Sequence, residues 1–196
     1  VIGCAIALTT GYVLFPRWES EQLTTYMLDV LRANRHYLHR LGESLAGRPL
    51  SPTEYKLARK DVYISSANLA AAFQRMLSEP KSKQRHEAEV HQFVVLNLIL
   101  SSNIATLAAA ARSGGLPVGP ADVVKPVRQA LMLLTESLRK LGAAEVPELS
   151  PLPAALPAAP ADKPTPIGEE RLLLEQLEFV QKVSNDLRKV TDVVAA

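Results

Sequence analysis

The chain is nearly free of cysteine, since Cys4 is the only one among its 196 residues. One thiol cannot form a disulfide within the chain, so nothing points to an oxidising compartment. Cys4 stands in an apolar stretch, where it is better explained as a small packing residue than as a nucleophile or a metal ligand. A chain of this length can bury a core without cross-links, so the sequence predicts one main folded domain.

The chain also lacks an excess of charge of one sign. Its 22 basic and 20 acidic residues leave a formal net charge of +2. Nucleic-acid binding depends on clustered bases that neutralise many phosphates. The charge balance therefore argues against a nucleic-acid partner.

Aromatic residues make up only 5% of the chain, although 47% of all residues are hydrophobic. Alanine and leucine supply most of this apolar content and favour helices over strands. No segment combines β-branched residues with strict alternation of apolar and polar side chains. We therefore predict an all-α fold, an antiparallel helical bundle of about four long helices joined by a linker to a C-terminal helix.

Residues 1–15 contain no charged side chain and predict part of a membrane-spanning helix. About 20 apolar residues are needed to cross a bilayer, so we expect the first turns to lie before Val1. The run lacks the basic start and small-residue cleavage site of a signal peptide. The Pro-Arg-Trp sequence at 16–18 is typical of the membrane–water interface. We assign 1–17 to the end of a transmembrane helix that contacts the lipid bilayer, with a buried core helix as the alternative.

Bases outnumber acids by five to four over residues 17–48, through Arg17, Arg32, Arg35, Arg40 and Arg48. Segments rich in arginine and lysine next to a span tend to stay in the cytoplasm. We therefore expect residues 18–196 on the cytoplasmic side.

Four helices are predicted within 18–142, the range assigned to a cytoplasmic helical bundle. Their apolar side chains recur at alternating spacings of three and four residues, as packed helices require. The predicted ranges are 19–46, 52–79, 83–112 and a fourth helix that Pro126 begins or bends and Gly142 ends. The predicted buried stripes are Met27, Leu31, Asn34, Leu38, Leu41 and Leu45; Tyr55, Ala58, Val62, Ser65, Leu69, Ala72 and Met76; Val90, Phe93, Asn97, Leu100, Ile104, Leu107 and Ala111; and Val127, Leu131, Leu134, Leu138 and Leu141.

The second helix has a characteristic start. Ser51 supplies a capping hydroxyl, Pro52 suits the first helical position, and Glu54 is placed to accept from the backbone amide of Ser51. The third helix is apolar nearly all round and could be mistaken for a second membrane span. Its several Ser, Asn and Thr side chains would need partners in lipid, so we predict a central helix of the bundle.

Residues 143–168 hold 7 of the chain's 14 prolines and predict an extended Pro/Ala-rich linker. A C-terminal amphipathic helix follows in 169–196. Such an apolar face should not stay in water, so we expect it to dock on the bundle or to pair with the same helix of a second copy in a homo-oligomer. The face consists of Leu173, Leu177, Val180, Val183, Leu187, Val190 and Val194.

The histidines are the main candidates for a metal site. They form two pairs, His36 with His39 and His86 with His91, each among charged or amide side chains. No Glu-x-x-His sequence of the kind used by diiron bundles occurs. We interpret all four as solvated or helix-end residues, and a metal-dependent bundle enzyme is the weakest hypothesis.

Other catalytic patterns are missing from the sequence, which contains no Gly-x-Ser-x-Gly and no glycine-rich phosphate loop. We therefore predict no enzymatic activity, no cofactor and no catalytic residue, and the sequence identifies no substrate-binding residue. Asn34, Asn68 and Asn97 lie within helical stripes and could line a ligand path. A buried asparagine more often fixes the register of packed helices.

Two parts of the chain, its beginning and the second predicted helix, resemble a known family. Gly3-Cys4-Ala5-Ile6-Ala7 and Phe15-Pro16-Arg17-Trp18 are similar to the end of the last membrane span of the fusaric-acid-resistance-like (FUSC) bacterial inner-membrane proteins, in particular the YccS-type branch. Arg59-Lys60, Ala67-Asn68-Leu69-Ala70-Ala71-Ala72 and Arg75-Met76-Leu77-Ser78-Glu79-Pro80 resemble a helix of that branch. Lys60 and the bulky Val62-Tyr63-Ile64 depart from its pattern. The resemblance covers residues 1–80.

This resemblance implies two membrane blocks, each followed by a helical cytoplasmic region, in a transporter that exports aromatic acids or other organic anions. The chain would then be the C-terminal cytoplasmic region, an assembly or regulatory domain in contact with the rest of the transporter chain. The alternative is a soluble helical-bundle interaction or scaffold protein with no transport role.

Overall fold

The computed structural model describes residues 3, 19–48, 51–82, 84–112, 121–152 and 167–196. These residues form five helices and no strand, which confirms the predicted all-α fold. The predicted transmembrane end at 1–17 lies outside the described residues except for Gly3, and so does the linker segment 153–166. The helices are α2 (Glu19–Leu45), α3 (Pro52–Leu77), α4 (Glu87–Arg112), α5 (Ala121–Lys140) and α6 (Ile167–Val194).

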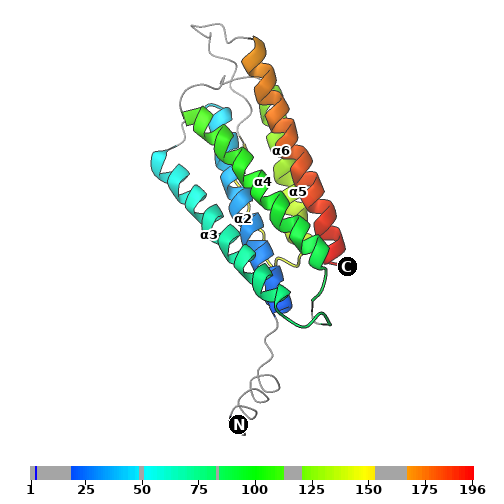
Figure 1. Ribbon diagram of the computed structural model, residues 1–196. Coiled ribbons are helices and arrows are strands. Elements are labelled where there is room, and N and C mark those ends of the chain that lie inside the picture. The colour runs from blue at the N-terminus through cyan, green and yellow to red at the C-terminus, as the bar shows by residue number, and fades with distance from the viewer. Residues whose placement is uncertain (1–2, 4–18, 49–50, 83, 113–120, 153–166) are drawn as a thin grey trace.

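The helices lie side by side along one long axis (Figure 1). α2 contacts α4 and α5, and α6 contacts the same two helices from the opposite side, so these four form a closed ring. α3 packs outside this ring, against α2 and α4. The C-terminal helix is therefore an integral member of the four-helix core, and the additional helix is α3.

The chain direction differs from a purely antiparallel bundle. α5 and α6 run parallel, because Lys140 and Glu136 near the end of α5 pair with Asp192 and Arg188 near the end of α6. α2 and α4 also run the same way (Figure 1). Parallel neighbours need long crossover connections. α3 provides the crossover between α2 and α4, and the segment after α5 contributes to the crossover between α5 and α6.

The predicted stripes account for most of the core. Every residue of the stripes on α2, α3 and α5 is buried, and so are those on α4 and α6 apart from Ala111 and Val194 at their last turns. The buried face of each helix consists mainly of apolar side chains and contains few polar ones. The C-terminal stripe is buried within the same chain, where α6 contacts α4 and α5.

Two helix ends follow the glycine rule. Gly47 has φ 96° and Gly142 has φ 82°, in the left-handed region where a side chain is strained. After each glycine a backbone N–H bonds back across the last turn, Arg48 N to Glu43 O at 2.9 Å and Ala143 N to Leu138 O at 3.1 Å.

The start of α3 was predicted only in part. Ser51 is the N-cap residue and Pro52 follows it, but the Ser51 side chain makes no cap hydrogen bond. The Glu54 carboxylate lies 3.6 Å from the Arg40 guanidinium of α2 instead. A tertiary ion pair therefore stands in place of the expected local hydrogen bond to the Ser51 amide. α5 begins before Pro126, which lies inside the helix.

Candidate functional site: the strap and its basic groove

The described part of the predicted linker is not a free tether. We call residues 143–152 the strap. It contains no helix, yet Leu152 is buried and Val146 and Leu149 pack partly against the core. The strap has no regular secondary structure, and it contacts the bundle through Val146, Leu149 and Leu152.

Three side chains hold the strap through its backbone carbonyls. Arg35 Nη2 donates to Pro147 O at 2.9 Å, and His39 Nε2 donates to Ser150 O at 2.7 Å. Arg128 Nη2 of α5 donates to Leu152 O at 3.3 Å. Prolines leave a segment with few backbone donors, so its carbonyls must find donors elsewhere. The arginines and the histidine supply them.

Gly42 allows the strap to approach α2 closely. A Cβ atom at this position would lie 2.9 Å from Val127 Cγ1 and 3.0 Å from both methyl carbons of Leu152. Any larger residue would force Leu152 or Val127 to move. Gly42 lies in the last turn of α2, where a glycine still weakens a helix relative to alanine, and here it makes room for the strap and α5.

An ion cluster lies beside this contact. Glu43 accepts from Arg40 at 2.8 Å and from Arg48 at 2.7 Å, and His39 Nδ1 is 3.8 Å from the same carboxylate. Burial alone would raise the pKa of Glu43, but the Arg40 hydrogen bond and the nearby positive charges outweigh it and lower that pKa below its usual value. Glu43 is therefore ionised at neutral pH, and its negative charge lies beside the ring of His39.

The strap forms one side of a groove of about 870 Å³ against α2 and α5. Arg35, Arg128 and Arg139 line it, together with the carboxylates Glu136 and Glu148. Burial, and after it the positive charge of Arg139, lowers the pKa of Arg35. This groove therefore concentrates guanidinium groups that repel one another and would favour an anionic group between them.

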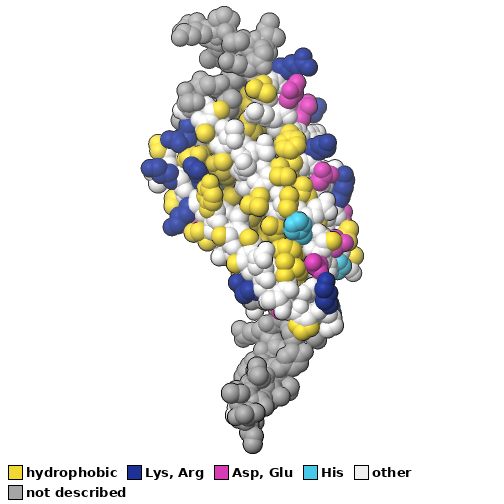
Figure 2. All heavy atoms as spheres, viewed as in Figure 1, with side chains coloured by type: hydrophobic (Ala, Val, Ile, Leu, Met, Phe, Trp, Pro, Cys, Tyr) yellow, Lys and Arg dark blue, Asp and Glu magenta, His cyan; other side chains and the backbone are white. Residues whose placement is uncertain are grey.

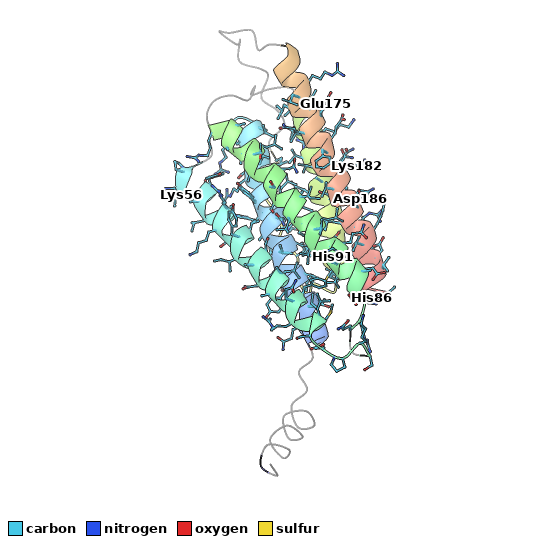
Figure 3. The ribbon with its side chains drawn as sticks, viewed as in Figure 1. Lys56, His86, His91, Glu175, Lys182 and Asp186 are labelled. Atoms are coloured by element: carbon cyan, nitrogen blue, oxygen red, sulfur yellow. The ribbon has the colours of Figure 1, made fainter. Side chains whose placement is uncertain are left out.

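The histidine predictions are partly wrong. His36 is exposed, as expected, but His39 is only 5% exposed because the strap covers it. Figure 3 shows His86 and His91 near the N-terminal end of α4, and both are exposed. The ring of His91 lies beside that of Phe73, with centroids 5.8 Å apart and the planes tilted by 31°. Among the described residues, no group of three or more His, Cys, Asp or Glu is placed to hold a metal ion.

The three asparagines divide into two kinds. Asn34 and Asn97 are buried and bond to each other, whereas Asn68 is exposed on α3. Asn34 and Asn97 therefore fit the interpretation that a buried asparagine fixes the register of packed helices. The three asparagines do not line a common ligand path.

Sequence reasoning missed the strap-facing side of α2. Arg35, His39, Gly42 and Ala46 follow one another at spacings of four, three and four residues, and all four are buried. This second stripe runs beside the apolar one, but its members are charged or small. The available signal was Gly42, a glycine before the end of the predicted helix and three residues after His39 on the same face.

α4 stands out by its hydropathy. Among the described residues it is the one helix that is long and apolar enough to cross a membrane, with a mean hydropathy of 1.8 over its best window. Of the 18 residues in this most apolar stretch of the helix, 33% are buried in the structure. The helix packs against α2, α3 and α6. Its polar side chains find partners nearby, such as Asn103 Nδ2 to Ile99 O at 2.7 Å and Thr106 Oγ1 to Ser102 O at 3.0 Å.

Comparison with known proteins gives one informative similarity. The chain is 28% identical over 109 residues to the inner membrane protein YccS of Escherichia coli (strain K12). The match covers 56% of this chain and 15% of the relative. No family model matches the chain, and no solved structure matches it. The similarity is to a membrane protein, and it agrees with the branch that the sequence resembles.

Proposed function

We propose that this chain is part of a bacterial inner-membrane transporter of the FUSC type, in which residues 18–196 form a cytoplasmic assembly or regulatory domain. In this proposal 1–17 is the end of a membrane span, and the transporter exports aromatic acids or other organic anions. The bundle itself has no enzymatic role.

The similarity to an inner membrane protein carries this proposal. The described helices support it in a second way, because α2 to α6 bury their apolar stripes against one another and form a core of their own. A domain with such a core can stand in water beside the membrane and does not need the preceding residues to complete it. In this proposal residues 1–17 are not needed to cover the apolar faces of the bundle, so they can contact lipid.

The arrangement of the strap supports a regulatory rather than a purely structural role. The segment after α5 is held by three side-chain to carbonyl hydrogen bonds and by Leu152, and it borders a groove lined by guanidinium groups. Such contacts are weak individually, each contributing about 1 kcal/mol. A segment held in this way can be displaced by an anionic ligand or by another part of the transporter.

Membrane fractionation of the full-length protein tests the assignment. We expect recovery with the inner membrane and release only by detergent, and recovery in the soluble fraction without detergent would refute the proposal. A chain beginning at Glu19 provides the second test. We expect it to be soluble and to unfold at the same temperature as the domain within the full-length protein.

The alternative function is a soluble helical interaction or scaffold protein in which the first segment belongs to the core. The closed ring formed by α2, α4, α5 and α6 is compatible with this function. The chain beginning at Glu19 separates the two, because deletion of a core helix would unfold the rest of the protein. Loss of helical content in that chain would therefore favour the scaffold.

A further inference from the structure

A second hollow, separate from the strap, opens between α3 and α4. Its volume is about 430 Å³, and Tyr37 of α2 lines its inner end. α3 and α4 contact each other less than any other pair of neighbouring helices. The side chains that α4 presents here are small, including Ser101, Ser102 and Ala105, so they leave the space between the helices unfilled.

Two polar atoms in this hollow have no hydrogen-bond partner among the described residues. They are Tyr37 Oη and Ser66 Oγ, and both are buried. The Tyr37 side chain as a whole is 1% exposed, so packing fixes its position. Buried hydroxyls without a partner are rare, because they lose their bonds to water and gain nothing in return. Two such groups that line the same hollow indicate a missing polar partner.

The hydroxyl of Tyr37 can act as a donor at any physiological pH. Burial, and after it the nearby hydroxyl of Tyr55, which does not form a hydrogen bond of proper geometry with Tyr37 Oη, raises the pKa of Tyr37 above its usual value. The two rings lie with centroids 6.0 Å apart and are tilted by 55°. Ser66 can either donate or accept. The pair therefore matches a group that offers one acceptor and one donor, as a primary amide does.

The walls of the hollow favour a flat apolar body. Tyr55, Tyr63 and Leu98 line it, and ring faces bind other rings well. Tyr63 and Leu98 are 62% and 51% exposed and so form the mouth. Figure 2 shows apolar side chains on this face of α3 and α4, with Lys and Arg along the outer edge of α3.

Charge in the hollow is confined to its mouth. Arg59 is the one ionisable side chain other than tyrosine among the described lining residues. Its guanidinium already donates to Tyr63 Oη at 3.3 Å and lies 5.4 Å from the centre of that ring. The inner end near Tyr37 offers hydroxyl groups and no positively charged lining residue, and the Arg112 guanidinium lies outside the lining, 4.5 Å from the centre of the Tyr55 ring. An anion placed there would be desolvated without a counter-charge, which is unfavourable.

We propose that this hollow is a binding site for a small uncharged ring compound, whose amide-like polar group bonds to Tyr37 and Ser66. The volume is within the usual range of small-molecule sites and suits one or two fused rings. The site does not depend on the proposed transport function, because its residues all belong to the described bundle.

The test uses indole-3-carboxamide as the probe and the detergent-solubilised 196-residue chain. Isothermal titration calorimetry should show saturable binding to one site. Tyr37→Phe and Ser66→Ala should each weaken binding about tenfold, the effect of one lost hydrogen bond. Ser101→Leu should abolish binding by filling the hollow. Tyr26→Phe, a matched change on α2 that does not line the hollow, should leave the affinity unchanged.

Circular dichroism of each variant checks that it is folded. Two analogues of the probe test its chemical class. Indole-3-carboxylate should bind more weakly than the amide, and tighter binding of this anion would overturn the proposal in favour of selection by Arg59. 3-Methylindole should also bind more weakly. Equal binding of 3-methylindole, no effect of Tyr37→Phe, or no saturable binding of the amide would each refute the site.

Discussion

Asn34 of α2 and Asn97 of α4 form a hydrogen bond across the centre of the bundle, with Asn34 Nδ2 donating to Asn97 Oδ1 at 3.1 Å. Asn97 Nδ2 donates in turn to Phe93 O at 2.9 Å. Both side chains are buried, at 0% and 1% exposed. The pair connects two parallel helices and sets their relative height, because only one register brings the two amides together.

Replacement of one member of this pair should be more harmful than replacement of both. In Asn97→Leu the amide of Asn34 is left without its acceptor, so the free energy of unfolding should fall by about 1–3 kcal/mol. In the double variant Asn34→Leu/Asn97→Leu most of this loss should be recovered, because two apolar side chains need no partner. Urea unfolding of the two single variants and the double variant measures the coupling. Additive effects would show that the bond contributes nothing.

Tyr37→Phe should not destabilise the protein without ligand. The hydroxyl has no partner among the described residues, and removal of a buried unsatisfied group should raise the free energy of unfolding by about 1 kcal/mol. Tyr37→Ala should lower it by about 3–5 kcal/mol, because the ring is 1% exposed and leaves a cavity. Thermal unfolding of both variants measures these changes. A loss of stability in Tyr37→Phe would mean that the hydroxyl has a structural partner.

Glu43 should make stability depend on pH in the acid range. Its pKa in the folded protein is lowered, so its contribution is present above the ordinary value of 4.5 and is lost as the pH falls through the folded value. At neutral pH, Glu43→Gln should lower the free energy of unfolding by about 1 kcal/mol. At acid pH, where the wild-type carboxylate is protonated, the difference between the two proteins should disappear. Urea titrations at neutral and acid pH provide the measurement.

Glu148 is an exposed acid on the strap and serves as the control for this pH dependence. Its replacement by glutamine should leave the acid limb of the stability curve as in the wild type. A Glu43→Gln curve parallel to that of the wild type at every pH would contradict the assigned ion cluster.

The docking of the strap should be separable from the stability of the bundle. In Gly42→Ala the new Cβ would lie within 3.0 Å of Leu152, while alanine favours the helix by about 1 kcal/mol over glycine. We therefore expect little change in the unfolding temperature but faster proteolytic cleavage within 143–152. Leu152→Ala should also accelerate cleavage. Wild-type cleavage rates in both variants would show that Leu152 does not hold the strap.

The apolar stripes could be predicted because helix packing follows local spacing. The stripe on α3 shows this most clearly, since the seven residues from Tyr55 to Met76 selected by spacing are all buried. Phe73 is buried too, one position beside the stripe. The buried face of α3 contacts both α2 and α4 and is therefore wider than the predicted stripe. The spacing of apolar residues along the sequence does not give the width of that face.

The environment of His39 could not be predicted, because it depends on residues more than a hundred positions away. The nearby charged residues suggested a solvated face, but Ser150 covers the ring at 2.7 Å. Glu54 was misassigned because its partner Arg40 comes from the preceding helix, and local spacing within one helix does not show such a contact. Local patterns identify which side of a helix is apolar. They do not show which polar side will be covered by a non-helical segment.

The position of α6 leads to the last prediction. Leu187 is 0% exposed and lies in the ring with α4 and α5, whereas Leu172 on the same helix is 55% exposed. Leu187→Ala should lower the free energy of unfolding by about 2–5 kcal/mol. Leu172→Ala should change it by less than about 0.5 kcal/mol. The loss in Leu187→Ala should be independent of protein concentration, because the contact is made within one chain. A homo-oligomer held together by this helix would instead give an unfolding temperature that rises with concentration, and that dependence would be weakened in the variant. Thermal unfolding over a hundredfold range of concentration therefore decides whether α6 stabilises its own bundle or joins two copies.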